Sequence, residues 1–62
     1  MILKTLKNYR IKEIDKLVSK LHSTKNLDAR MDICDEIIDE LLDNDIEVDS
    51  IEDSIKNLAI NN

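Results

Sequence analysis

The 62-residue sequence contains no glycine, proline, tryptophan or phenylalanine, and only one cysteine, one histidine and one tyrosine. Without glycine a phosphate-cradling loop cannot form, which excludes Walker-type and dinucleotide-binding sites. Tight hairpin turns usually need Gly or Asn-Gly, and chains without helix breakers are usually helical. The composition therefore predicts an all-α fold without a sheet.

The sequence also lacks the features needed for a disulfide, a membrane span or a signal peptide. Because Cys34 is the only cysteine, no disulfide can form within the chain. No apolar run approaches the ~20 residues of a membrane span, and Met1-Ile2-Leu3-Lys4 lacks the apolar core of a signal peptide. We therefore expect a cytoplasmic protein without membrane contact. A core this small rarely supplies more than ~3–5 kcal/mol, which favours self-association or a partner.

Apolar periodicity predicts three helices in a single domain, 1–62, at about 3–22, 27–42 and 50–59. The first has an apolar stripe wide enough to touch two neighbours. In the second, the a/d positions of a two-heptad seam are Leu27, Met31, Cys34, Ile38 and Leu41. Residues 46–49 fit either an extended or a helical conformation. The prediction is a small three-helix domain, or a helical hairpin with a short third helix, that dimerises through an apolar helix face.

Arg10 interrupts the apolar stripe of the first predicted helix, between Leu6 and Ile14. A guanidinium buried there must be paired, so it either meets a carboxylate from another element or subunit, or snorkels to the rim. We therefore assign Arg10 to assembly and expect a dimer at micromolar concentrations.

No residue pattern indicates catalysis, a cofactor or a metal. Acidic residues alternate over 43–49 as in an EF-hand loop, but Val48 stands where glycine is required and Ser54 where a bidentate glutamate is required. Cys34 falls in the apolar seam and is expected in the core. Ser19 and His22 share one helix face, which cannot enclose a substrate. We expect a non-catalytic protein with no catalytic, cofactor-binding or metal-ligating residues.

Charge is distributed unevenly along the chain, whose net charge is −5. Residues 1–25 carry seven basic and two acidic side chains, and residues 26–62 carry two basic and twelve acidic ones. Four aspartates within about 80° of each other on the wheel of the second helix are the candidate partner-binding residues. They are Asp32, Asp35, Asp39 and Asp43. Lys12, Lys16 and Lys20, four residues apart, form a basic ridge on the first helix.

These two surfaces give two functional hypotheses. The first is a protein–protein interaction module, a regulator or inhibitor that docks on a macromolecular partner through helical faces, as suits a phage- or plasmid-encoded accessory protein. Electrostatic potentials of opposite sign on the two partners speed such docking and orient it. The alternative is a dimeric nucleic-acid-binding regulator whose basic ridge contacts phosphates.

Overall fold

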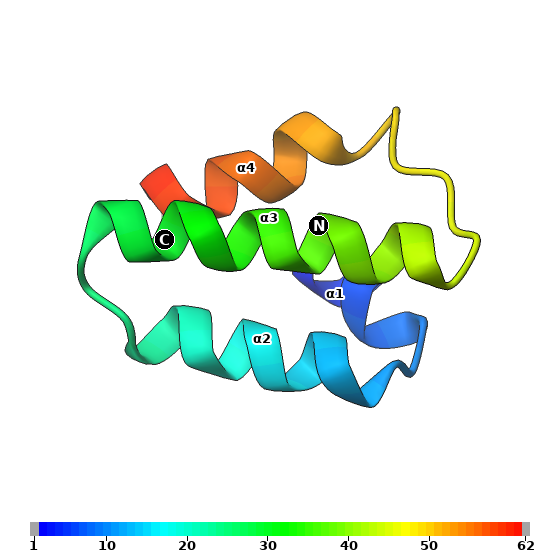
Figure 1. The fold of residues 1–62 in the computed structure, drawn as a ribbon, viewed down its shortest axis with the longest axis horizontal. Coiled ribbons are helices and arrows are strands. Elements are labelled where there is room, and N and C mark those ends of the chain that lie inside the picture. The colour runs from blue at the N-terminus through cyan, green and yellow to red at the C-terminus, as the bar shows by residue number, and fades with distance from the viewer. Residues whose placement is uncertain (1, 62) are drawn as a thin grey trace.

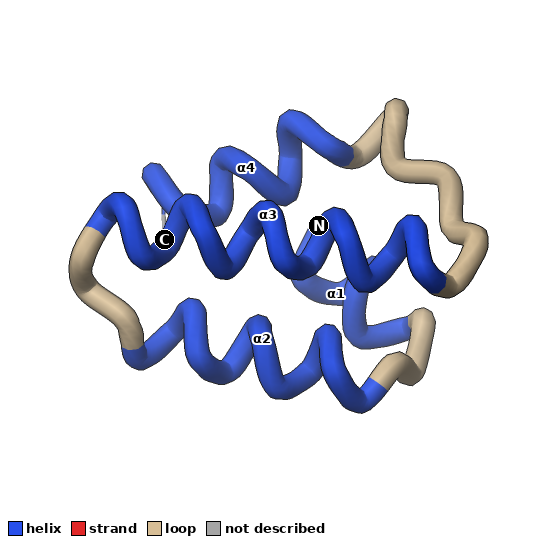
Figure 2. The backbone as a smooth tube through the Cα atoms, in the orientation of Figure 1, coloured by secondary structure: helices blue, strands red, loops and turns tan. Residues whose placement is uncertain are grey.

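A computed structural model describes residues 2–61, without the side chain of Asn61, as four α-helices joined by short loops (Figures 1 and 2). The helices are α1 (Ile2–Asn8), α2 (Lys12–Ser23), α3 (Leu27–Asp43) and α4 (Glu52–Asn61). No strand occurs within 2–61, which confirms the all-α prediction. Residues 46–48 have no regular structure and residues 49–51 form a turn, so the stretch left open by the sequence is not helical.

α3 is the central helix of the fold (Figure 1). α2 and α4 flank it and both run antiparallel to it, while α1 lies behind, as the figure is drawn. Contacts join α2 to α3, α3 to α4 and α1 to α2. The Cα radius of gyration is 10.5 Å and the extents are 29 × 21 × 20 Å. Because α2 and α4 pack on α3, one side of α3 is buried, and the opposite side is exposed to solvent.

The core draws on all four helices and on the loop before α4. Leu6, Ile14, Leu21, Leu41 and Ile55 are completely buried. Ile37 is also completely buried, and the remaining buried hydrophobic residues are Ile33, Cys34, Ile38, Val48 and Ala59. α1 seals this core with Leu6, which explains how so short a helix remains docked.

The single helix predicted at 3–22 is two helices, α1 and α2, separated by a turn at Tyr9 and Arg10. Arg10 adopts a left-handed conformation with φ of 57°, and its amide donates to the carbonyl of Lys7 at 3.1 Å. Ile11 is extended and its carbonyl accepts the amide of Asp15, which starts α2. A left-handed residue after the last turn commonly ends a helix, and in this chain it is not a glycine.

The predicted position of Arg10 inside an apolar stripe was therefore wrong. Its side chain is exposed in the turn, because the left-handed backbone takes it out of the helical register on which the stripe was drawn. The width of that stripe also has a local cause, since residues 3–22 supply the buried faces of two differently oriented helices. Both features that suggested a dimer are thus accounted for within one chain.

Specific hydrogen bonds define both ends of α3. At its start, Asn26 Oδ1 accepts the amide of Ala29 at 3.1 Å, as expected of an N-cap. At its end, Asp45 is left-handed with φ of 60°, and the amides of Asp45 and Ile46 donate to Leu42 and Leu41 at 3.0 Å. This is a Schellman motif with aspartate in the place that glycine usually takes.

The buried face of α3 differs from the predicted seam. Leu27 and Met31 are 51% and 49% exposed, whereas the face that is buried consists of Arg30, Ile33, Cys34, Ile37, Ile38 and Leu41. The seam assumed a single partner helix. Because α3 packs between α2 and α4, its buried side is broader and is centred away from Leu27 and Met31.

Candidate functional site

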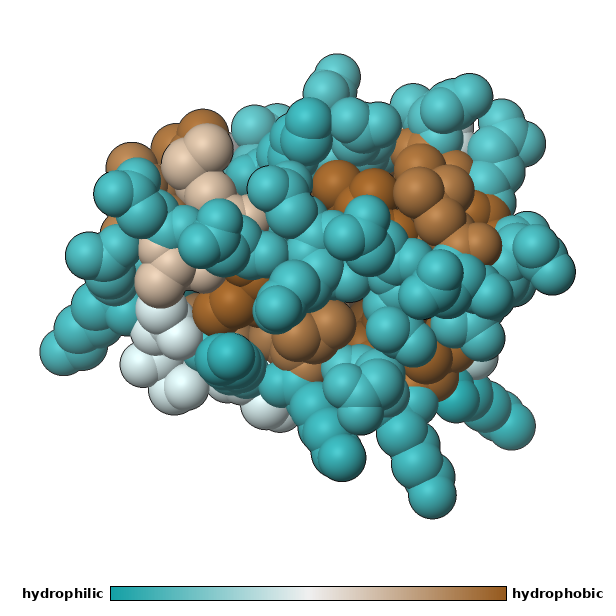
Figure 3. Space-filling model, in the orientation of Figure 1, coloured by the Kyte–Doolittle hydropathy of each residue, from teal (hydrophilic) through white to brown (hydrophobic). Residues whose placement is uncertain are grey.

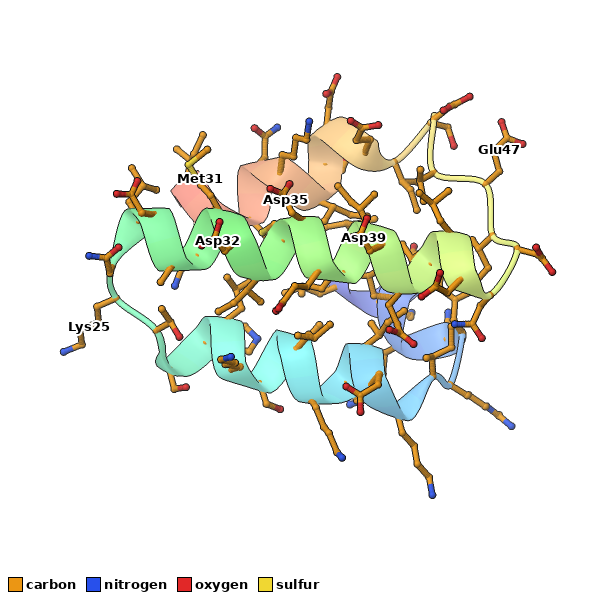
Figure 4. All side chains as sticks on the ribbon, in the orientation of Figure 1. Lys25, Met31, Asp32, Asp35, Asp39 and Glu47 are labelled. Carbon is orange, nitrogen blue, oxygen red and sulfur yellow. The ribbon has the colours of Figure 1, made fainter. Side chains whose placement is uncertain are left out.

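The four candidate aspartates of α3 are all exposed, and we call them the acidic face: Asp32, Asp35, Asp39 and Asp43. Asp32, Asp35 and Asp39 project from α3 toward the viewer in Figure 4, on the side opposite α1. In the space-filling view, hydrophilic side chains run along α3 with apolar surface on both sides (Figure 3). The fold therefore presents these carboxylates along one side of its central helix.

The acidic face takes no part in the ion pairs of residues 2–61. Those pairs join Lys16 Nζ to Glu13 at 3.7 Å and Lys56 Nζ to Glu52 at 3.0 Å. α3 has no basic residue in its last turn, where Asp43 instead faces the negative end of the helix dipole. The acidic residues toward the C-terminal end of α3 therefore stand where they oppose helix stability.

The basic ridge, Lys12, Lys16 and Lys20, is exposed along α2. It lies next to the acidic helix, because α2 packs on α3. A groove of about 380 Å³ between the two helices is lined by Lys20 and Glu13 from α2 and by Glu36, Asp39 and Glu40 from α3. The two candidate surfaces are thus neighbours, and opposite charges line the groove between them.

A larger groove, of about 560 Å³, separates α1 from α2. Lys4 and Lys7 line it from α1, and Asp15, Ser19 and His22 line it from α2. The polar side chains considered above for nucleophilic chemistry therefore lie along one wall of an open groove. Lys4 and Lys7 bring positive charge to this groove, and Asp15 brings negative charge.

Arg30, which lies beside the predicted a/d seam and is there a weaker candidate than Arg10 for a buried cation, is the buried cation of the fold. It is 7% exposed and donates to four backbone carbonyls. Nη1 donates to Leu21 at 2.9 Å and to Thr24 at 2.7 Å, while Nε and Nη2 each donate at 3.0 Å, to Ala59 and Leu58. These acceptors lie at the C-terminal ends of α2 and α4, where the last carbonyls lack an amide donor from the same helix. The carbonyl of Leu21 also accepts the amide of the cap residue Thr24 at 3.3 Å. The available signal was its spacing, three residues before Ile33 and four before Cys34.

Cys34 is a core residue, 1% exposed. Burial raises the pKa of its thiol above the ordinary value of 9.0, although a hydrogen bond with the backbone of Ala59 and the charge of Arg30 oppose that shift. A protonated, buried thiol is a weak nucleophile and a poor metal ligand. The geometry accordingly assigns Cys34 to packing between α3 and α4.

A shallow groove between α3 and α4, with a volume of about 360 Å³, adjoins the acidic face. We call it the α3–α4 groove. Its lining residues are Met31, Cys34, Asp35, Lys56 and Ile60. Figure 4 shows Met31 beside the C-terminal end of α4, with Asp35 further along the same groove. An apolar surface and a carboxylate row thus meet along α3.

In comparisons with known proteins, no family model, curated protein or solved structure matches this chain. Within the described residues, no three histidine, cysteine or acidic side chains converge as metal ligands would. None of the helices over 2–61 has the length and apolarity needed to cross a membrane.

Proposed function

We propose that this protein is a non-catalytic interaction module, a regulator or inhibitor that docks on a basic protein partner through the acidic face. The observation that carries the proposal is the placement of Asp32, Asp35, Asp39 and Asp43, all exposed on one side of the central helix. Carboxylates in such a row attract a positive surface and orient it as it approaches. A phage- or plasmid-encoded regulator of a host protein fits this description.

A second argument for the proposal is energetic. Like charges four residues apart repel each other, and acidic groups near a helix C-terminus oppose the dipole. Asp39 lies four residues from both Asp35 and Asp43, so it repels each of them, and Asp43 also opposes the dipole in the last turn. Helix stability alone would favour lysine or glutamine at these positions. Residues that lower stability are more readily explained by binding than by folding.

The same proposal includes a cytoplasmic location. A single cysteine that is buried as a thiol requires no oxidising compartment, which supports this placement.

The deciding experiment compares two matched sets of charge-removing substitutions. In one variant the four aspartates of the acidic face are replaced by asparagine, and in the other Lys12, Lys16 and Lys20 are replaced by glutamine. Proteins retained from the native host by the wild type are identified, and their association rates are measured against salt concentration. The asparagine set should slow association and flatten its salt dependence, while the glutamine set should leave both unchanged. A loss of binding in the glutamine set alone would contradict the proposal.

The alternative function is a dimeric regulator that binds nucleic acid through the basic ridge. It is favoured by the exposure of all three lysines and by Lys4 and Lys7 along the neighbouring groove. A second copy would double this positive surface. Retention on duplex DNA or RNA that falls steeply with salt, and that the glutamine set abolishes, would establish this function instead. Sedimentation equilibrium would show whether two copies are required.

A further inference from the structure

We propose that the α3–α4 groove receives the apolar stripe of a basic amphipathic helix, whose cationic side chains pair with the aspartates beside the groove. This inference rests on the proposed function and specifies the chemistry of the partner. It adds an apolar contact to a site that charge alone would define loosely.

The first supporting observation is a concentration of exposed apolar side chains at one end of the molecule. Among the large hydrophobic residues described, the exposed ones are Leu27 at 51%, Met31 at 49%, Leu42 at 52% and Ile60 at 67%. Met31 and Ile60 line the α3–α4 groove, and Leu27 and Ile60 line the adjoining one beside Arg30. Three of the four therefore form one connected surface around Ile60, while Leu42 lies at the opposite end of α3.

The second observation is the charge beside that surface. Asp28, Asp32 and Asp35, at positions i, i+4 and i+7, follow the same side of α3 and are all exposed. Asp35 itself lines the groove. The groove's lysine, Lys56, is already paired with Glu52 at 3.0 Å. The α3 edge of the groove is therefore negative, whereas Lys25 and Arg30 line the adjoining groove on the other side of Ile60. A partner with lysine or arginine beside its apolar stripe complements the α3 edge.

The same charges argue against a second copy of this chain as the occupant. A twofold dimer uses the same surface on both subunits. Pairing this surface with itself would bring the two rows of aspartates close together, and like-charge juxtaposition disfavours association. A basic helix gains the apolar contact without this repulsion.

The dimensions suit a short helix. The exposed aspartates from Asp28 to Asp39 span about 16 Å along α3, which equals three turns of a partner helix lying beside it. At about 360 Å³ the groove lies at the lower end of the ~300–1,000 Å³ typical of small-molecule pockets. Two or three apolar side chains spaced along a partner helix would fill it.

The test uses a synthetic 14-residue helix with leucine along one stripe and lysine elsewhere, labelled with a fluorophore. A scrambled peptide of the same composition lacks the stripe. The affinity of both is measured by anisotropy for the wild type, Met31→Gln, Ile60→Gln and the matched control Leu42→Gln. We expect Met31→Gln and Ile60→Gln to weaken binding of the striped peptide about tenfold, and Leu42→Gln to change it by less than about twofold. Binding should also shift the ¹³C-methyl resonance of Met31 in the wild type.

Each contrary result overturns the inference in a distinguishable way. Equal effects of the three substitutions, or equal binding of the scrambled peptide, would mean that charge alone attracts the peptide. If the asparagine set on the acidic face releases the native partner but Met31→Gln does not, the proposed function stands and the apolar site is wrong. If the wild type sediments as a dimer that Met31→Gln dissociates, the groove is an interface between copies. Circular dichroism melting of each variant confirms that the fold is retained.

Discussion

At the residue scale, Arg30 makes the strongest prediction about stability. Replacing it by methionine preserves much of its apolar stem but leaves the carbonyls of Leu21, Thr24, Leu58 and Ala59 without this donor. We expect a loss of about 3 kcal/mol in the free energy of unfolding, measured by urea titration. Arg30→Lys should lose nearly as much, because an ammonium group cannot reproduce the planar fork. Lys25→Met, at an exposed position, is the control and should change stability by less than about 0.5 kcal/mol.

A second residue-level prediction concerns the left-handed positions. Arg10→Gly and Asp45→Gly should each raise the free energy of unfolding by about 0.5–1 kcal/mol, because glycine adopts positive φ without the steric cost that a side chain incurs. The control is Ser19→Gly, at an exposed position inside α2, which should lower stability by a similar amount. Destabilisation by all three substitutions would show that the turn at Arg10 is not left-handed.

The pH dependence of stability should report the burial of Cys34. Because burial raises the pKa of this thiol in the folded state, ionisation above pH 9.0 favours the unfolded chain. The stabilisation that the buried, protonated thiol gives to the folded state is fully present below the thiol's pKa in the unfolded chain. It is lost as the pH rises through the higher pKa of the folded state. The difference in the free energy of unfolding between the wild type and Cys34→Ala, measured by urea titration, should therefore narrow as the pH rises above 9.0. A difference that stays constant over this range would contradict the assignment.

The two arginines show what the sequence reveals about single residues. Arg10 was assigned to a buried stripe on the assumption of one continuous helix, although a polar residue at the centre of such a stripe is equally a sign of a break. Arg30 lies beside the predicted a/d seam, and it is a weaker candidate for a buried cation on the sequence than Arg10, because the spacing centres that seam on Met31 and Cys34. Its actual acceptors are up to 29 residues away in sequence, in two other helices. Local periodicity contains no information about such partners.

At the scale of the helix, α3 has opposite charge preferences at its two ends. Asp28 lies in the first turn, where a carboxylate stabilises the helix, and Asp43 lies at the end, where it opposes the dipole. We expect Asp28→Asn to lower the free energy of unfolding and Asp43→Asn to raise it, each by about 0.3–1 kcal/mol at low salt. The paired measurement at 1 M salt should reduce both effects, since screening shortens the range of these interactions. Equal signs would refute the electrostatic account.

The sequence predicts two of the helices, α3 and α4, better than it predicts α1 and α2. The second and third predicted segments, 27–42 and 50–59, correspond to α3 at Leu27–Asp43 and α4 at Glu52–Asn61. The break at Tyr9 and Arg10 was missed because no glycine or proline marks it, and neighbouring apolar residues continue the pattern across it. The exposure of the acidic face followed from amphipathicity alone. The α3–α4 groove did not, because it depends on where α4 docks along α3.

For the whole molecule, the net charge of −5 predicts a response to salt. Most of the negative charge lies on α3, α4 and the loop between them, whereas the basic residues lie chiefly on α1 and α2. Repulsion within the acidic half should exceed the attraction between halves, because only two exposed ion pairs occur over 2–61. Raising sodium chloride from 0.02 to 0.5 M should therefore raise the free energy of unfolding by about 0.5–1 kcal/mol. A decrease would indicate that attraction between the halves dominates.

The hydrogen bonds of Arg30 also determine how the chain can come apart. The guanidinium of Arg30 donates to carbonyls at the ends of two helices that do not follow each other in sequence. If either α2 or α4 detaches, the cation loses hydrogen-bond acceptors while the other helix still buries it. Partly opened forms are thereby raised in energy relative to both the native and the fully unfolded chain. Unfolding should be two-state, with coincident urea transitions for Tyr9 fluorescence and for far-ultraviolet circular dichroism. In Arg30→Met the two transitions should separate, because α2 and α4 can then unfold independently of each other.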